Sequence, residues 1–385
     1  MASRCPVSAG SVRRGGMRDN PPEKEASPET GDSMTDVRFA TIGTSAITER
    51  FVAALAEVPG TRYVAAYSRD LSRAKEFGES RGATLAFDDL NALAASDQVD
   101  AVYVASPNGA HARQASLLAQ GGKHVLVEKA FASNEREATE AFARAHESGV
   151  VCMEAMRNLH TPGFHNVAAN LARVGRVSQA TFRYGKVTSR IAKLRAGEHV
   201  NQFDPALSEG GLMDIGVYAV EPAIALFGRP ERVSASLLTI PLPWEPEPSG
   251  AKIDLAGSVV LSYPRAIVDL NYSKVANDFY GAQVAGDAGT LMWEQTNCPA
   301  DLRFVPYEDK GMVYSAAGGK AEVIPANMPD NDMTCEVATF VDAINGDVDA
   351  LGRVAFCERV TVGSLAVMDE ARRQAGIRFP ADDAR

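Results

Sequence analysis

The chain has 385 residues, of which 45% are hydrophobic and 23% charged, an ordinary composition for a soluble globular protein of two or three domains. Its 49 acidic and 39 basic residues give a net charge of −10, which argues against nucleic acid or an anionic membrane surface as the main partner. No apolar run approaches the roughly 20 residues of a membrane span. The five cysteines form neither a C-x-x-C motif nor a metal-ligand spacing, so the sequence predicts free thiols, a cytoplasmic location and no metal site.

Residues 1–33 differ from the rest of the chain. They contain four prolines, several Gly and Ser residues and no apolar signal-peptide segment, so we expect a disordered tail. Met34 stands just before the first strand-like run. The tail is therefore either part of the protein or an upstream extension of its start site.

Strand-like and helix-like segments alternate from Asp36 onward. The expected strands are Val37–Ile42, Tyr63–Tyr67, Ala101–Ala105, His124–Val127 and Val150–Met153, and the expected helices are Thr48–Val58, Leu71–Arg81, Ala110–Ala119 and Asn134–Glu147. This alternation is typical of right-handed βαβ units and a parallel sheet buried on both faces. It predicts a Rossmann-like domain over residues 34–157.

The pattern changes after residue 158. The expected elements are a helix at Gly210–Phe227, strands at Val233–Ile240, Leu255–Ser262, Ala266–Tyr272, Gln283–Ala285, Leu291–Trp293 and Leu302–Val305, and closing helices at Met333–Ile344 and Arg353–Ala375. Val259 and Leu261 alternate with Ser258 and Ser262, and Pro and Gly stand between the strands, as in hairpins. The fold class is therefore α/β, with a second α/β domain over residues 158–385 built on a largely antiparallel open sheet.

The first turn from strand to helix resembles part of a dinucleotide-binding motif. The usual pattern is G-x-G-x-x-[GA], but only Gly43 is present, with Ser45 and Thr48 at the other two glycine positions. Such a turn leaves backbone N–H groups at a helix N-terminus to hold a pyrophosphate. A plain βα turn is the alternative, and the motifs that follow favour the cofactor site.

The second strand ends at Ser68-Arg69-Asp70, where an NAD enzyme usually has an acid for the ribose. Ser68 stands 25 residues after Gly43. A hydroxyl followed by a guanidinium suits the 2′-phosphate of NADP. Alternatively, Arg69 is a solvated charge and Asp70 caps the next helix.

Two further strands end in polar residues. Ser106-Pro107-Asn108 follows the strand Ala101–Ala105, and Glu128-Lys129 follows His124–Val127. The carboxyl ends of strands in an open α/β sheet line the ligand crevice, so Lys129 is a candidate to polarise a substrate oxygen or to lower the pKa of a neighbouring acid. An ordinary Pro-Asn turn, a surface histidine at His111 and a surface Glu-Lys pair are the alternatives.

Asp214 and Tyr218 are spaced i, i+4 in the expected helix Gly210–Phe227, so they share one face. The flanking residues are apolar, and a buried Asp and Tyr need partners, which functional sites often supply. The alternative is an Asp near a helix N-terminus and a Tyr packed in the core.

Jointly, these motifs resemble the glucose-fructose oxidoreductase/inositol dehydrogenase (Gfo/Idh/MocA) family over Asp36 to Pro380. The matching segments are Gly43–Thr48, Ser106-Pro107-Asn108 with His111, Glu128-Lys129, Glu154–Arg157, Gly210–Tyr218 and Gly376–Pro380. The segment Glu154–Arg157 and the Asp214–Tyr218 pair resemble most the branch of D-xylose dehydrogenases and dihydrodiol dehydrogenases. One position departs: the family usually has a proline, often after a cis bond, where this chain has Ala130. A cis bond costs ~2.5–4 kcal/mol before a residue other than proline, so a different backbone route for Lys129 is expected.

The resemblance implies an NAD(P)-dependent oxidoreductase that transfers a hydride between nicotinamide and a secondary alcohol or carbonyl of a sugar, polyol or cyclic diol. NADP is the expected cofactor, with NAD possible. The implied cofactor-binding residues are Gly43, Thr44, Ser45, Ala46, Ile47, Ser68, Arg69, Ser106, Pro107, Asn108, His111, Glu128, Lys129 and Arg157. Arg157, His160 and the loop 186–207 are expected to contact the substrate, and the open sheet face is expected to form a homo-oligomer, either a dimer or a tetramer.

The implied catalytic residues are Lys129, Asp214 and Tyr218. A tyrosine hydroxyl is a poor base at neutral pH, and the ammonium of Lys129 would favour its phenolate form. Asp214 would orient Lys129 or bind a substrate hydroxyl. Alternatively, Lys129 carries the proton itself and Tyr218 only binds the substrate. A second function class is a catalytically silent, NADP-binding regulatory sensor, which would not need these three residues together.

Overall fold

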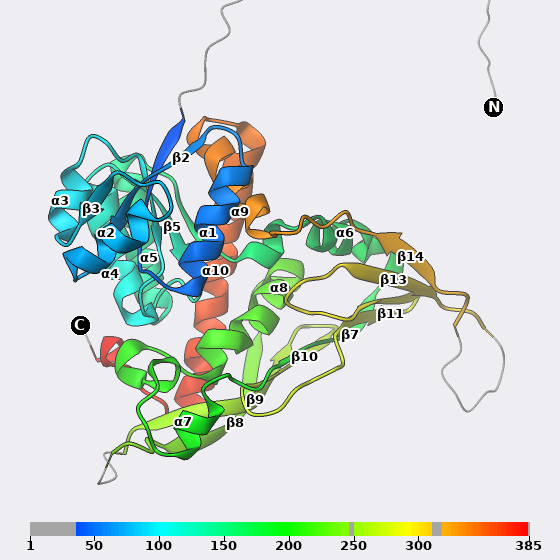
Figure 1. Ribbon diagram of the computed structural model, residues 1–385. Coiled ribbons are helices and arrows are strands. Elements are labelled where there is room, and N and C mark those ends of the chain that lie inside the picture. Colours follow the sequence, from blue (N-terminus) through cyan, green and yellow to red (C-terminus); the bar gives the residue numbers. More distant parts are fainter. Residues whose placement is uncertain (1–35, 246–249, 310–317, 384–385) are drawn as a thin grey trace, which may run out of the picture. The chain divides into compact units, whose positions relative to one another are not determined.

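The computed structural model describes residues 36–245, 250–309 and 318–383 (Figure 1). The predicted tail, residues 1–33, lies outside these described residues. The strands of the described residues form two sheets, one of six strands and one of eight.

The six-stranded sheet comes first along the chain. Its elements are β1 (Val37–Ile42), α1 (Ala46–Glu57), β2 (Thr61–Tyr67), α2 (Leu71–Glu79), β3 (Leu85–Phe87), α3 (Leu90–Ala95), β4 (Ala101–Val104), α4 (Asn108–Gln120), β5 (His124–Glu128), α5 (Glu135–Ser148) and β6 (Cys152–Ala155). All neighbouring strands are parallel, in the order β3-β2-β1-β4-β5-β6. This is the Rossmann order, in which the ligand crevice lies at the carboxyl ends of the adjacent strands β1 and β4.

Every expected strand and helix of this sheet is present, with ends that differ by a few residues. The two elements that the sequence pattern missed, β3 and α3, are only three and six residues long. Side-chain caps begin three of these helices, α2, α3 and α5. At the start of α5, Asn134 accepts a hydrogen bond from the N–H of Glu137 at 2.9 Å.

The eight-stranded sheet has the order β14-β13-β12-β11-β7-β10-β9-β8. Its strands are β7 (Val177–Gly185), β8 (Arg232–Pro241), β9 (Lys252–Ser262), β10 (Ile267–Ser273), β11 (Ala282–Gly286), β12 (Gly289–Trp293), β13 (Asp301–Pro306) and β14 (Glu322–Pro325). All pairs are antiparallel except β7–β10. The predicted fold class is therefore confirmed. β7 and β14 were not predicted, because their alternating residues include many polar side chains.

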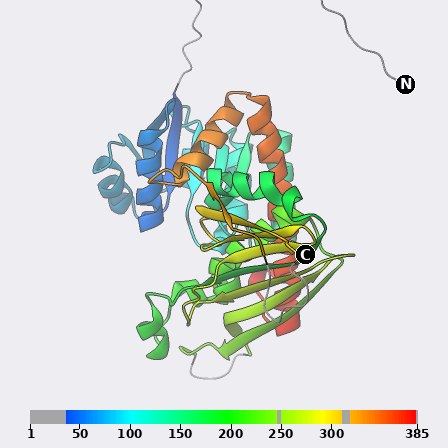
Figure 2. The same ribbon diagram turned by 90° about the vertical axis from the view of Figure 1, so that its right-hand side faces the viewer.

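The described helices of this second part are α6 (Pro162–Asn170), α7 (Ile191–Arg195), α8 (Val217–Phe227), α9 (Met333–Ile344) and α10 (Val348–Ala375). α8 and α10 pack on one face of the sheet (Figure 1). On β10, the buried residues Val268 and Leu270 face these helices. In Figure 2 the strands of this sheet lie in front of α10, so the opposite face of the sheet is turned to the viewer. Apolar side chains stay exposed on that face, among them Ile267 and Met292.

The expected helix Gly210–Phe227 is divided in the structure. A π-helical turn, Leu212–Gly216, precedes α8 and carries Asp214. Tyr218 lies in the first turn of α8.

α9 returns to the first sheet and completes its core. The Phe340 ring lies 6.2 Å from that of Phe39 on β1, and Val337 and Val341 belong to the same buried cluster. The limits 34–157 and 158–385 remain a prediction, and this packing adds C-terminal residues to the core of the N-terminal sheet.

Candidate active site

The turn after β1 is shaped to receive a phosphate group. Gly43 has a φ of +103°, and a β-carbon there would stand 2.6 Å from the carbonyl oxygen of Ala105 at the end of β4. Only glycine allows this close approach. Ser45 caps α1 with its backbone and makes no side-chain capping bond, so N–H groups of the first helical turn stay open to a ligand.

This turn contains the five predicted residues from Gly43 to Ile47, and Ser45 and Ile47 line a cavity of about 570 Å³. Thr48, at the third glycine position, is buried and its hydroxyl lies 3.3 Å from that of Ser45. The residues present therefore fit a dinucleotide pyrophosphate although two motif glycines are missing.

The three polar residues after β2, Ser68, Arg69 and Asp70, have different surroundings. Asp70 accepts hydrogen bonds from the N–H groups of Ser72 at 2.9 Å and Arg73 at 3.3 Å, so it caps α2, as the alternative interpretation had it. Arg69 is exposed, and within residues 36–245, 250–309 and 318–383 its side chain forms no hydrogen bond or ion pair. Ser68 and Arg69 remain the predicted site for a 2′-phosphate.

Residues after β4 line the same cavity and hold its wall together. Ser106 donates to Gln114 at 2.7 Å, and the Asn108 amide donates to the carbonyl oxygen of Ser208 at 3.1 Å. Pro107 precedes α4 at its cap position.

His111 is buried, so the alternative of a surface histidine is wrong. Its two ring nitrogens lie 2.9 Å from the carbonyl oxygen of Ala130 and 2.6 Å from that of Ser106. Burial lowers the pKa of His111 to about 4, so at neutral pH it is uncharged. The uncharged ring can donate to only one of these two carbonyl oxygens, and its position between them packs it against the turns after β4 and β5.

β5 ends at Glu128 and is followed by Lys129, and both residues line the cavity. The buried Glu128 accepts hydrogen bonds from the Tyr103 hydroxyl and, at 3.2 Å, from the N–H of Lys129. The Lys129–Ala130 peptide bond is cis, the isomer that the family often has before proline, so the expected different backbone route is not seen.

Lys129 and Asp214 form an ion pair in the cavity. The Lys129 Nζ lies 3.0 Å from Oδ1 of Asp214 and 2.8 Å from its backbone oxygen. Lys274, which follows β10, forms an ion pair with Oδ2 of the same carboxylate and is 6% exposed. Two ammonium groups thus share one carboxylate beside the dinucleotide turn.

Tyr218 is half-buried and lines the same cavity. Its ring centre lies 5.5 Å from the Lys129 Nζ and 5.6 Å from the Arg157 guanidinium carbon, and the Tyr184 ring stands edge-on to it at 5.6 Å. Arg157 forms an ion pair with Asp332. The structure therefore brings the three predicted catalytic residues together, with Arg157 beside the tyrosine ring.

Asp332 is buried and lies at the start of α9. Besides Arg157 it pairs with Arg50 of α1 at 2.6 Å. A charged chain thus links the helix of the dinucleotide turn to the residue that packs on Tyr218. His160, in contrast, is buried against Thr339 and Cys357 and does not line the cavity, so its expected substrate contact is not seen.

Five residues of the cavity lining were not predicted from the sequence, the apolar Ala105 and Ile215 and the three polar residues Tyr184, Glu209 and Lys274. Burial raises the pKa of Glu209 to about 7 and lowers that of Lys274, which also lies near Lys129, to about 8. Lys274 directly follows a strand, as Lys129 does. Neighbouring antiparallel strands run in opposite directions, so their carboxyl ends lie on both edges of a sheet, and the sequence pattern could not place Lys274 in the site. The expected loop 186–207 contributes Lys186, Val187, Thr188, Ser189 and Gln202 to the lining.

No described helix is both long and apolar enough to cross a membrane. Within the described residues, no group of three or more His, Cys, Asp or Glu side chains is arranged to hold a metal ion.

Comparison with known proteins gives two matching family models. One, described as an oxidoreductase family with an NAD-binding Rossmann fold, matches residues 37–156, and the GFO/IDH/MocA C-terminal domain matches residues 172–292. A relative from Bacillus subtilis (strain 168), scyllo-inositol 2-dehydrogenase (NADP(+)) IolU, is 38% identical over 348 residues, which cover 90% of this chain and all of that protein. Trans-1,2-dihydrobenzene-1,2-diol dehydrogenase of Mus musculus is 24% identical over 359 residues, 90% of this chain and 99% of that protein.

Among solved structures, the 3-ketoreductase KijD10 from Actinomadura kijaniata, in complex with NADP and TDP-benzene, superposes with a TM-score of 0.71. It is 22% identical and covers 90% of this chain and 99% of its own, a similarity that shows the fold. Fold, cavity and family models define an NAD(P)-dependent oxidoreductase. The chain belongs to the Gfo/Idh/MocA family. The predicted family and enzyme class are confirmed, and the alternative of a silent sensor is not supported.

Proposed function

We propose that this protein is an NADP-dependent dehydrogenase that oxidises a secondary alcohol of a sugar, polyol or cyclic diol, or reduces the matching carbonyl. One observation carries the proposal: the Lys129–Asp214 ion pair lies beside Tyr218 in a cavity that also contains Ser45 and Ile47 of the dinucleotide turn. The groups proposed to move the proton and the turn proposed to bind the cofactor thus line the same cavity.

The residues of the turn Gly43–Ile47 would hold the pyrophosphate on the open N–H groups of α1. Ser68 and Arg69 would hold the 2′-phosphate, since a hydroxyl and an unpaired guanidinium suit a phosphate dianion. Ser106, Asn108 and Glu128 line the same cavity as Ser45 and Ile47 of the dinucleotide turn.

A bound nicotinamide supplies or accepts the hydride. The protein has to move one proton at the substrate oxygen, and Tyr218 is placed to do so. The Lys129 ammonium, 5.5 Å from its ring centre, stabilises a phenolate, and Asp214 holds that ammonium in place. In the alternative assignment, Lys129 carries the proton and Tyr218 hydrogen-bonds the substrate.

The substrate class rests on two supports. The relatives named above act, by their names, on scyllo-inositol and on a cyclic diol, and the cavity presents Lys129, Asp214, Gln202 and Thr188 as polar groups suited to hydroxyls. The test is to follow nicotinamide absorbance with NADP or NAD and a panel containing scyllo-inositol, D-xylose and a trans-cyclic diol. Turnover by the wild type and a large loss in Tyr218→Phe are expected. No turnover with any alcohol, despite tight NADPH binding, would contradict the proposal.

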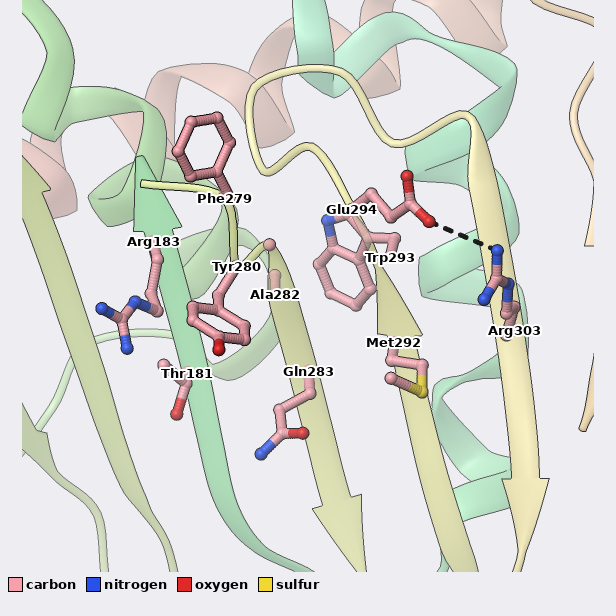
Figure 3. Close-up of a pocket in the computed structure, with 11 residues that line it drawn as sticks. Thr181, Arg183, Phe279, Tyr280, Ala282, Gln283, Met292, Trp293, Glu294 and Arg303 are labelled. Carbon is pink, nitrogen blue, oxygen red and sulfur yellow. Dashed lines mark hydrogen bonds and ion pairs between the residues drawn. The ribbon is translucent and has the colours of Figure 1, made fainter. Parts of the chain in front are cut away.

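The proposal also covers assembly and location. Phe279 and Tyr280 are 88% and 76% exposed beside the outer sheet face, and Met292 lies on that face. With Arg183 and Gln283 they border a hollow of about 370 Å³ (Figure 3). Exposed aromatic groups at a sheet face suit a second copy of this chain, so we expect a dimer or tetramer.

Light scattering after size exclusion tests the assembly. The wild type should elute as an oligomer, and Phe279→Asp with Met292→Asp should shift it toward monomer; a monomeric wild type at micromolar concentration would refute this part. A cytoplasmic location is supported by Cys152, Cys298, Cys335 and Cys357, which are all free thiols.

A further inference from the structure

Asp214 is shared between two lysines that come from different sheets. Lys129, at the end of β5, takes Oδ1, and Lys274, just after β10, takes Oδ2. The Lys274 side chain is the more enclosed of the two, with 7% exposed against 16% for Lys129. Its Nζ also lies 5.4 Å from the Phe203 ring centre, so the ammonium has an aromatic face as well as a carboxylate to hold it.

Three charged groups besides Asp214 act on the Lys274 ammonium. Lys129 and Lys186 both act on it as like charges, and Glu209 acts as an opposite charge. Burial raises the pKa of Glu209 to about 7, so near neutral pH its carboxylate is only partly available. Asp214 is thus the main fixed anion for two enclosed ammonium groups.

We propose that Lys274 is a positioning residue of the dehydrogenase site: by holding Oδ2 of Asp214, it fixes the carboxylate on Lys129 and adds a positive charge beside the group that accepts the substrate proton. The inference rests on the proposed function. A positive charge favours the deprotonated form of either candidate carrier, Tyr218 or Lys129, so its effect has the same sign in both assignments.

Removing this charge therefore has a predictable effect on the pH profile of alcohol oxidation. In Lys274→Met the proton acceptor is harder to deprotonate, so the rising limb of kcat/KM should move upward by about one pH unit. Because Asp214 also loses a partner that orients it, kcat at the optimum should fall about tenfold to a hundredfold. Lys274→Arg keeps the charge, so its rising limb should stay near that of the wild type even if kcat falls.

A second readout does not depend on turnover. Competitive acetylation of the ligand-free protein, followed by mass spectrometry, measures the pH at which the Lys129 amine becomes reactive. In Lys274→Met this midpoint should move to higher pH, because Lys129 is then the lysine that remains paired with Asp214 and it loses a neighbouring positive charge. Lys252→Met, at an exposed lysine on β9, is the matched control. It should change neither the rising limb of kcat/KM nor the pH midpoint of Lys129 acetylation.

The outcomes separate the two proposals. A Lys274→Met enzyme with unchanged limb, unchanged Lys129 midpoint and normal thermal stability overturns the role of Lys274 while leaving the dehydrogenase intact. Equal loss of activity in the Met and Arg variants with no shift of the limb also overturns it, since that pattern needs only a packing role. If the wild type oxidises no alcohol, the proposed function fails, and the labelling midpoints still decide the coupling of Lys274 to Lys129.

Discussion

Gly210 and Asp254 are in such close contact that a β-carbon at Gly210 would stand 2.4 Å from Oδ1 of the aspartate. The Asp254 carboxylate also accepts hydrogen bonds from the N–H of Leu212 and, at 2.6 Å, from the Tyr272 hydroxyl. Gly210 has a φ of +150°, which L side chains rarely adopt. This contact fixes the π-helical turn that carries Asp214, and so it sets the position of the Lys129–Asp214 ion pair.

Gly210→Ala should therefore damage both the fold and the site. The substitution introduces backbone strain and a clash with a buried carboxylate, and we expect unfolding to become easier by about 1–3 kcal/mol. Urea unfolding and NADP-dependent turnover measure the two effects. Gly352→Ala in α10, where a β-carbon meets nothing within 4 Å, is the control and should leave both unchanged or slightly raise stability. A fully stable and active Gly210→Ala protein would show that the contact does not set the turn.

Removing the Tyr218 hydroxyl tests the proton carrier. Tyr218→Phe should lower turnover ~10²–10⁴-fold, as for a lost general acid–base, while NADPH affinity should survive because the proposed nucleotide site at the Gly43 turn is unchanged. Lys129→Met should also lower turnover, and the double variant should lose much less than the product of the two losses, since both residues serve one step. Tyr307→Phe, at an exposed tyrosine, should be silent. Near-normal turnover in Tyr218→Phe would leave Lys129 as the carrier.

The parts of the site that follow one parallel sheet were predictable from the sequence. Strand ends of a parallel sheet meet at one edge, so Gly43, Ser106 and Lys129 could be placed together without a structure. The i, i+4 spacing of Asp214 and Tyr218 also indicated a shared face, although the turn between them is π-helical rather than α-helical.

Contacts that cross between the sheets could not be predicted. Lys274 and Glu209 line the cavity but come from the second part of the chain. The local periodicity of a sequence predicts an antiparallel strand, but it does not predict which end of that strand lies next to the first sheet. The same limit applies to β7, whose exposed face is polar, and to α9, whose apolar face covers β1 from some 300 residues away in the sequence.

Arg69→Ala tests the cofactor preference. If the guanidinium binds the 2′-phosphate, the change should weaken NADPH binding by ~1.5–3 kcal/mol, the size of a hydrogen bond to a charged group, and leave NADH binding nearly unchanged. Fluorescence titration of both nucleotides gives the two dissociation constants. Arg62→Ala, at an exposed arginine within β2, serves as the control. Equal losses for both nucleotides would mean that Arg69 stacks on the adenine or only supports the fold.

The buried carboxyl pair Glu154–Glu221 predicts how the free energy of unfolding depends on pH. Glu221 of α8 and Glu154 of β6 hydrogen-bond each other, and Glu154 also accepts from the N–H of Phe131 at 2.8 Å and from the Thr361 hydroxyl at 2.6 Å. Burial, and then the neighbouring Glu154, hold the pKa of Glu221 well above its usual range. Glu221 is therefore the protonated partner, and it donates to Glu154.

The sign of the effect follows from the raised pKa. The folded protein keeps a proton on Glu221 that the unfolded chain releases near pH 4.3, so this group's contribution is complete below that pH and is lost as the pH rises toward the folded pKa. The loss amounts to about 1.4 kcal/mol for each pH unit. Glu221→Gln keeps a donor to Glu154 and cannot ionise, so it should flatten the decline in unfolding free energy between about pH 5 and pH 8. Relative to the wild type, the variant should be more stable at pH 8 and no more stable at pH 5.

Urea unfolding at a series of pH values measures this difference. Glu57→Gln, at an exposed residue of α1, is the matched control and should leave the slope unchanged. Parallel curves for Glu221→Gln and the wild type would mean that Glu221 binds no extra proton in the folded protein. Its hydrogen bond to Glu154 would then have to come from the proton of Glu154, and Glu154→Gln should in that case flatten the curve instead.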